Sequence, residues 1–217
     1  MAHTRIWWHC RKPDMKYGFM ARVMPLILDK TVYGSIEAEG ITITKELKRS
    51  FRREYRAVVE RTPGLAKDNE LLSTLVIGCY LISFHKAAPE IVTEKVFEKI
   101  IISLCDEMKR RNKENDSIFS EKTIRMKKNA ALRSHDSKYE MDWVSTFRQN
   151  SEDNYEFTYT KCGLCELGKR ENCLYLIKYL CMTDYISYDI GGARLVREHT
   201  IAGGDGYCDF NVFRKER

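Results

Sequence analysis

The chain has 217 residues, of which 43% are hydrophobic and 31% are charged. This composition is typical of a globular protein and excludes the disordered and fibrous classes. The formal net charge is +6, and the basic excess lies in residues 1–140, where Lys and Arg are interleaved with Glu and Asp at helical spacing. We interpret this charge as a solvated helix surface and expect no nucleic-acid partner.

Export and membrane insertion are not indicated. Residues 1–14 lack the apolar core of a secretory signal. The longest apolar stretch, residues 71–84, is shorter than the roughly 20 residues that span a bilayer, so it predicts a buried helix. Without export, the eight cysteines favour free thiols or a metal site over a disulfide framework. We expect a soluble cytoplasmic protein with no membrane partner, and the sequence leaves its oligomeric state open.

The N-terminal part of the chain has helical patterns. Pro25 would kink the first helix or begin its second segment. Residues 118–134 are mixed and basic, and the sequence leaves open whether they form a further helix or a mobile connection. Amphipathic or apolar periodicity predicts the other helices, at residues 15–33, 44–59, 69–89 and 90–111.

After residue 139 the pattern changes to short strands and helices. Aromatic residues alternate with polar ones over 143–147 and 155–159, which predicts a hairpin of two half-buried strands. Two more strands are expected after the glycine pair Gly191-Gly192, joined by a turn rich in glycine. The remaining expected elements are helices at 161–168 and 173–188 and these two strands at 193–201 and 207–213.

The sequence thus predicts an α+β fold. A helical region at residues 1–138 would pack on an antiparallel sheet within the cysteine-rich residues 139–217, which also carry one or two helices. A chain of this length favours one compact unit over two full domains.

Cysteines are concentrated between residues 162 and 208. The spacing of Cys162 and Cys165 brings two sulfurs together and suits either a metal ion or a redox pair. Cys181 and Cys208 would complete a four-thiolate zinc site, although their spacing is looser than that of a zinc ribbon. Packing as a small buried hydrophobe is the alternative for each thiol, and we prefer it for Cys173.

Asp184 shares one face of the predicted helix 173–188 with Cys181. A carboxylate on a buried stripe needs a partner, which would be a ligand cation or a basic residue such as Arg194, Arg197 or His199. On the predicted strand 193–201, Arg197 and His199 point to the same face. On that face, Arg197 would bind an anion and His199 would act as a general base. The alternatives are that His199 is structural and that Asp184 forms a structural ion pair with an arginine.

Several segments of the C-terminal third agree in order and spacing with one enzyme family. They are Asp142-Trp143-Val144, YTKCGLC (159–165), YLCMTDY (179–185), TIAGG (200–204) and Cys208-Asp209-Phe210. With these segments, the chain resembles the L-2-amino-thiazoline-4-carboxylic acid hydrolase family.

The resemblance implies hydrolytic opening of a small cyclic amidine. Water would add to the carbon between the ring sulfur and nitrogen, giving a product like S-carbamoyl cysteine. As a hypothesis, a thiolate is the nucleophile, a carboxylate binds the amidinium, an arginine holds the substrate carboxylate, and a histidine moves protons. The candidate catalytic residues are Cys181, Cys208, Asp184 and His199, and the candidate substrate-binding residues are Arg197, Asp209 and Tyr185.

Two other functions fit the same residues. A non-catalytic sensor would use the cysteine-lined pocket to bind a small molecule or a metal, with zinc on Cys162, Cys165, Cys181 and Cys208 as the metal alternative. A thiol-redox protein would use Cys162 and Cys165. The hydrolase itself is expected to need a small-molecule substrate and no cofactor.

Overall fold

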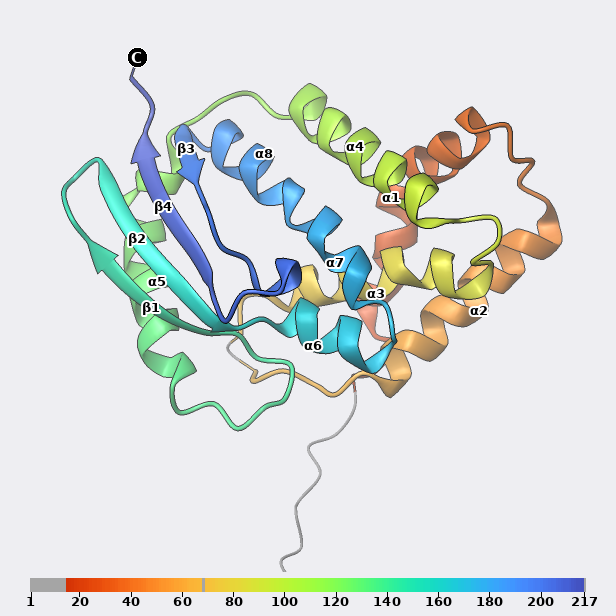
Figure 1. Cartoon of the computed structure of the whole chain (residues 1–217), viewed down its shortest axis with the longest axis horizontal. Helices are drawn as coiled ribbons and strands as arrows, with labels where there is room; N and C mark the ends of the chain where they lie inside the picture. The colour runs from red at the N-terminus through yellow and green to blue at the C-terminus, as the bar shows by residue number, and fades with distance from the viewer. Residues whose placement is uncertain (1–14, 68, 217) are drawn as a thin grey trace, which may run out of the picture.

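The structure is a computed structural model that describes residues 15–67 and 69–216. The first four helices of the helical region lie on one side of the molecule and the sheet on the other, whereas the fifth helix lies beside the sheet (Figure 1). A short 3-10 turn, Ser117–Phe119, leads into the last helix of this region. The helices are α1 (Phe19–Ala38), α2 (Lys45–Arg61), α3 (Leu72–Ala87), α4 (Glu94–Arg111) and α5 (Glu121–Ser134).

The C-terminal region is a four-stranded antiparallel sheet with helices inserted between its strands. The strand order is β1-β2-β4-β3, so the chain returns to pair its last strand beside β2. This arrangement confirms the predicted α+β fold. The elements are β1 (Val144–Gln149), β2 (Asn154–Lys161), α6 (Gly163–Arg170), α7 (Leu174–Leu180), α8 (Met182–Ile190), β3 (Ala193–Val196) and β4 (Cys208–Arg214).

Helix α5 occupies the segment for which the sequence left two interpretations open. The hydroxyl of Ser120 accepts a hydrogen bond from the backbone N–H of Thr123 at 3.3 Å and so caps the start of the helix. Such a cap satisfies one of the free N–H groups of the first turn. Helix α1, in contrast, runs through Pro25 without ending there.

The prediction of a single helix over residues 173–188 is wrong. The segment is divided into α7 and α8 at Cys181, which lies between the last residue of α7 and the first residue of α8 and caps both helices. Arg197 donates to the carbonyl of Cys181 at 2.9 Å. This bond satisfies a carbonyl at the end of α7, where such groups lose their partners within the helix.

The third strand is also shorter than expected, because β3 ends at Val196. Beyond it, the carboxylate of Asp209 accepts hydrogen bonds from the backbone N–H groups of Glu198 and His199 at 3.1 and 2.6 Å. These N–H groups bind a side chain instead of a neighbouring strand. Arg197 and His199 therefore lie outside the strand, and the rule that placed them on one face does not apply.

Aromatic side chains cover one face of the sheet. The rings of Phe157 on β2 and Phe210 on β4 stack with centroids 4.3 Å apart. Tyr155, Phe119 and Tyr188 belong to the same buried cluster. Since Tyr188 lies on α8, this cluster joins the sheet to the helix that begins directly after Cys181.

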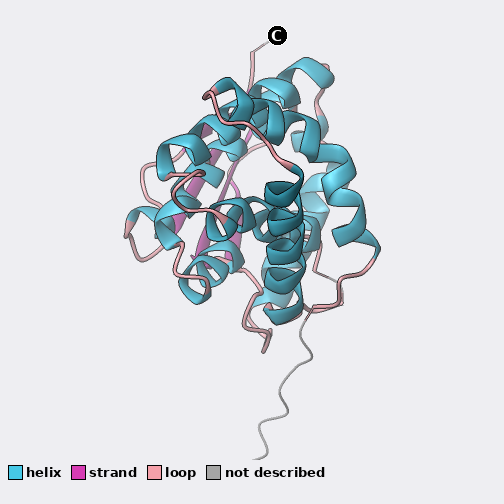
Figure 2. Cartoon of the chain, turned by 90° about the vertical axis from the view of Figure 1, so that its right-hand side faces the viewer, coloured by secondary structure: helices cyan, strands magenta, loops and turns pink. Residues whose placement is uncertain are grey.

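A larger cluster joins the helical region to the C-terminal helices. It includes Ile36, Phe51, Leu75 and Ile100 of α1 to α4 and also Ile177 of α7. In the side view the helices lie in front of the strands (Figure 2). The apolar segment 71–84 forms most of α3 and is largely buried from Leu75 onward, as predicted. No helix in the described residues combines the length and the apolar character needed to span a bilayer.

Candidate functional site

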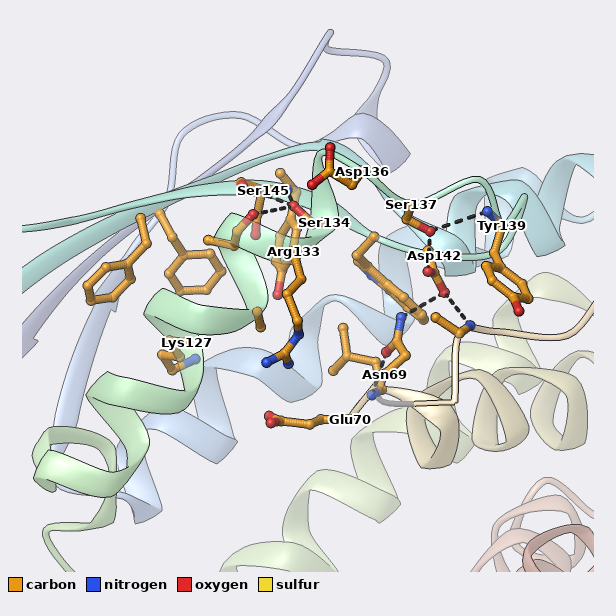
Figure 3. Close-up of a pocket in the computed structure, with 18 of the residues that line it drawn as sticks. Asn69, Glu70, Lys127, Arg133, Ser134, Asp136, Ser137, Tyr139, Asp142 and Ser145 are labelled. Carbon is orange, nitrogen blue, oxygen red and sulfur yellow. Dashed lines mark hydrogen bonds between the residues drawn. The ribbon is translucent and has the colours of Figure 1, made fainter.

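A pocket of about 510 Å³ lies between α5, the β1–β2 hairpin and the loop before α3. Figure 3 shows its polar side chains, with Lys127 at one end and Asp142 at the other. The walls combine polar and charged side chains with a group of aromatic ones. This size and lining suit a small-molecule ligand. The aromatic side chains are Tyr139, Trp143, Phe147, Phe157 and Tyr159.

At one end of the pocket, Asp142 accepts hydrogen bonds from two loops. Its buried carboxylate accepts hydrogen bonds from the backbone N–H of Ala66 at 3.2 Å, from the amide of Asn69 at 2.8 Å and from the hydroxyl of Ser137. These bonds replace the water that the carboxylate loses on burial. Asp142 therefore holds two loops together, and its oxygens are occupied by the protein.

Lys127 lies at the other end, in an aromatic box. Its ammonium group is 4.7 Å from the ring centre of Phe157, and the rings of Tyr155 and Tyr188 are 5.9 and 5.4 Å away. It donates a hydrogen bond to the hydroxyl of Tyr188 at 3.1 Å. Burial lowers the pKa of Lys127 to about 8, against the smaller opposing effects of Asp184 and Glu70.

Tyr159 connects this pocket to a second group of residues. It lines the pocket and pairs directly with Cys208 across β2 and β4. Burial, together with Asp184, Cys162 and Cys208, raises the pKa of Tyr159. Its phenol thus lies within electrostatic range of the thiols. We call this second group the thiol recess, and it consists of Cys162, Cys165, Cys181, Asp184, Arg197 and Cys208.

Asp184 is the carboxylate of the thiol recess. Desolvation by the surrounding protein raises its pKa, although Arg197 and Lys127 favour its charged form. Nevertheless, 38% of its side chain is exposed. The carboxylate is thus desolvated by its neighbours but keeps partial access to solvent.

Arg197 is the partner that the sequence required for Asp184. Its guanidinium donates to the Asp184 carboxylate at 2.7 Å and is covered by the rings of Tyr185 and Phe210 at 5.0 and 4.9 Å. Only 3% of the side chain is exposed. Its Nε has no hydrogen-bond partner within the described residues. Arg197 is thus committed mainly to holding Asp184.

Cys181 and Cys208 both belong to the recess. Each raises the pKa of Cys165, so the three thiols lie within electrostatic range of one another. Burial raises the pKa of Cys181 to about 12 and that of Cys208 to about 11. The sulfur of Cys208 also accepts a hydrogen bond from the backbone N–H of Ile201 at 3.2 Å. Both side chains are therefore protonated thiols at neutral pH.

Cys162 differs from these thiols. It immediately precedes α6, and its pKa is lowered by the Cys165 thiol, which hydrogen-bonds to it, and by the backbone N–H groups of Cys165 and Leu164. The start of a helix favours a thiolate for the same reason. Cys162 is partly exposed, whereas Cys165 is buried. It is the recess cysteine with a stabilised thiolate.

His199 and Asp209 pair with each other at the edge of the sheet. The ring nitrogen Nδ1 of His199 is 3.8 Å from the Asp209 carboxylate, and the ring stacks on Tyr207. Asp209 binds the backbone of the 198–199 segment, which lowers its pKa against the effect of burial. Asp209 and Cys208 are neighbours on β4, so they point to opposite faces. The candidate site residues predicted from the sequence are therefore divided between the thiol recess and this His199–Asp209 pair.

Sequence reasoning did not identify Lys127 or the pocket. Lys127 lies in the segment that the sequence left undecided, and the aromatic box around it comes from β2 and α8. The matched segments did contain Asp142, Trp143 and Tyr159, which now prove to be lining residues. The presence of these three residues in two of the matched segments was the signal available in the sequence.

The thiol recess does not have the geometry of a metal centre. Among the described residues, no group of three or more His, Cys, Asp or Glu side chains is arranged to hold a metal ion. The four cysteines that the sequence offered as zinc ligands share the recess without forming such a group. The cysteines of the described part of the chain are free thiols.

A model of one protein family matches residues 69–212, and its description is L-2-amino-thiazoline-4-carboxylic acid hydrolase. The match extends from the loop before α3 into β4, so it includes the thiol recess and every pocket-lining residue except Ala66. No curated protein and no solved structure matches the chain at a significant level. Because the family model covers more than half of the residues, the chain belongs to the L-2-amino-thiazoline-4-carboxylic acid hydrolase family.

Proposed function

We propose that this protein is a hydrolase that opens a small cyclic amidine resembling 2-amino-thiazoline-4-carboxylate. A thiolate adds to the carbon between the ring sulfur and nitrogen, and the ring C–N bond breaks as the nitrogen takes a proton. Water then adds to the same carbon and the thiolate leaves, so that a product like S-carbamoyl cysteine forms. One observation carries the proposal: the desolvated, partly exposed carboxylate of Asp184 lies within electrostatic range of the thiol Cys181 and of Cys162, whose pKa is lowered.

Asp184 binds the amidinium in this proposal. A planar cation with two N–H donors suits bidentate contact with a carboxylate. Arg197 favours the charged form of Asp184 and holds the carboxylate in place by donating to it at 2.7 Å. We therefore assign Arg197 to positioning Asp184, and not to direct binding of the substrate carboxylate.

Cys162 is the nucleophile that the physical chemistry favours. Nucleophilic addition needs a thiolate, and burial keeps Cys181 and Cys208 protonated. Cys165 stabilises the Cys162 thiolate by donating its S–H. Cys181 and Cys208 would then shape the recess and pass protons within it. His199 and Asp209, which bind each other and the 198–199 backbone, would hold the loop at its rim.

Hydrolysis of a panel of thiazolines and other cyclic amidines tests the proposal. Product release is followed by mass spectrometry for the wild type and for Cys162→Ala, Cys181→Ala, Cys208→Ala and Asp184→Asn. Cys105→Ala on α4, outside the recess, is the matched control. We expect turnover by the wild type and the control and its loss in Cys162→Ala and Asp184→Asn, with circular dichroism showing that each variant folds.

Absence of turnover on every compound would contradict the hydrolase. Binding of one of them without turnover would favour the sensor function. Loss of activity in Cys181→Ala or Cys208→Ala, with Cys162→Ala unaffected, would move the nucleophile to the sequence-predicted pair.

Dithiol–disulfide exchange at Cys162 and Cys165 is a second candidate function. The observation that favours it is the hydrogen bond between these thiols at the start of α6, with a partly exposed first cysteine and a buried second one. A thiolate of this kind attacks disulfides readily. Thiol titration in glutathione buffers tests this function. A reversible loss of two thiols, absent in Cys165→Ala, would support it.

A further inference from the structure

Lys127 presents an unusual electrostatic situation. Its ammonium group is desolvated among the rings of Phe157, Tyr155 and Tyr188. Within residues 15–67 and 69–216, the Tyr188 hydroxyl is its hydrogen-bond partner, and Asp184 and Glu70 act on it only at longer range. Burying a charge without a close counter-ion is unfavourable. A bound anion would offset that cost.

The pocket has room for such an anion together with an aromatic or planar ring. Its volume is about 510 Å³, and its wall includes Phe157, whose ring centre is 4.7 Å from the Lys127 ammonium, and Tyr159, whose ring packs edge-on against Phe157. Flat rings gain favourable contact against aromatic side chains. The ligand that fits this lining is therefore small, planar and anionic at one end.

Asp184 supplies the opposite charge. It lowers the cost of charging Lys127, and Lys127 in turn favours the charged form of Asp184, so the two groups lie within electrostatic range. Tyr159 belongs to the pocket wall and is also within range of Asp184. A ligand with a carboxylate at one end and an amidinium at the other would complement this pair of charges.

We propose that Lys127 binds the carboxylate of the substrate, a small heterocyclic acid whose ring lies in the aromatic pocket and whose amidinium points toward Asp184. This inference rests on the proposed function, because the amidine carboxylate is the substrate class named there. It assigns to Lys127 the role that the sequence gave to Arg197. Arg197 is unsuited because its side chain is 3% exposed and already paired with Asp184.

The test compares two substrates that differ only in the carboxylate. Hydrolysis of 2-amino-thiazoline-4-carboxylate and of 2-amino-thiazoline is measured for wild type, Lys127→Met and Lys127→Arg. Lys128→Met is the matched control, because Lys128 is the exposed neighbour on α5. We expect Lys127→Met to lower kcat/KM for the carboxylate about tenfold to a hundredfold, mainly through KM, as for loss of a charged hydrogen bond.

For 2-amino-thiazoline we expect no change in Lys127→Met, and for Lys127→Arg we expect a smaller loss with the carboxylate. Equal losses on both compounds, or no loss on the carboxylate, would overturn the proposal. Calorimetric titration with the carboxylate separates this inference from the hydrolase itself. Binding by the wild type that is lost in Lys127→Met supports the inference even without turnover, whereas no binding by the folded wild type overturns it.

Discussion

Arg197 and Asp184 form an ion pair in which the arginine is the more deeply buried partner. The N···O distance is 2.7 Å, and the exposed fractions of the side chains are 3% and 38%. We expect Arg197→Met to lower the free energy of unfolding by about 2–3 kcal/mol. This is less than for a fully buried pair, because the Asp184 left behind retains partial contact with water. Urea denaturation followed by circular dichroism measures it.

Arg194→Met is the control for this measurement. Arg194 lies on β3 and is exposed, with its guanidinium 5.0 Å from the ring centre of Phe213. Its loss is expected to cost less than about 1 kcal/mol. Equal effects of the two substitutions would show that the Arg197–Asp184 pair contributes little.

Alkylation kinetics distinguish Cys162 from the other cysteines of the described residues. We expect Cys162 to react first with iodoacetamide near neutral pH, because the thiolate is the reactive species and the pKa of Cys162 is the one that is lowered. Peptide mapping by mass spectrometry at successive times gives the order. Faster modification of Cys181 or Cys208 would contradict the assignment of the nucleophile.

Cys165→Ala extends the alkylation experiment. It removes the S–H donor to Cys162, so the pKa of Cys162 is expected to rise and its alkylation at neutral pH to slow. Cys173→Ala is the control, since burial raises the pKa of Cys173 and its sulfur contacts the carbonyl of Glu171. An unchanged rate at Cys162 in Cys165→Ala would show that the helix start alone stabilises the thiolate.

Lys127→Met is expected to leave the fold as stable as before or more so. The substitution replaces a desolvated ammonium group with an apolar side chain of similar length inside an aromatic box, and such replacements are often neutral or stabilising by about 1 kcal/mol or more. Thermal unfolding measures the change, with Lys128→Met as control. A fall in Tm of more than a few degrees would instead give Lys127 a structural role.

Much of the fold followed from periodicity. The aromatic alternation at 155–159 predicted β2, and the apolar run at 71–84 predicted α3, because local pattern and burial agree there. The division at Cys181 and the early end of β3 could not be predicted in this way. Both depend on tertiary hydrogen bonds, from Arg197 to the Cys181 carbonyl and from the 198–199 backbone to Asp209.

The site was predictable only where its residues lie close in the sequence. Asp184 and its need for a basic partner followed from one helical stripe, and Arg197 proved to be that partner. Lys127 gave no such signal, since its environment is made by Phe157 and Tyr188, which are distant in the chain. The stabilised thiolate of Cys162 likewise depends on where α6 begins.

Asp209 makes the stability of the fold depend on pH in the acid range. Its pKa is lowered, because hydrogen bonds from the His199 and Glu198 backbone outweigh the effect of burial. The stabilisation is therefore present above the unfolded value of about 3.9 and is lost as the pH falls through the folded pKa. We expect Asp209→Asn to cost about 1–2 kcal/mol at pH 7 and clearly less near pH 3.

Urea denaturation at the two pH values measures this difference. Glu198→Gln is the control, because Glu198 is exposed on the same loop and glutamine differs from glutamate mainly by the loss of the charge. A cost of Asp209→Asn that is equal at both pH values would show that the carboxylate charge does not stabilise the loop.

Gly163 lets the thiol pair approach the pocket. A Cβ at this position would lie 2.1 Å from the carbonyl oxygen of Met141 and 2.7 Å from the ring of Trp143, so Gly163→Ala would force backbone atoms apart. We expect a loss of about 3 kcal/mol or more in the free energy of unfolding, at the upper end of the range for overpacking. Gly34→Ala on α1 is the control, because nothing lies within 4 Å of its added Cβ. There we expect a gain of about 0.5–1 kcal/mol from helix propensity, and a similar small effect at both glycines would mean that the segment before β1 moves freely away from α6.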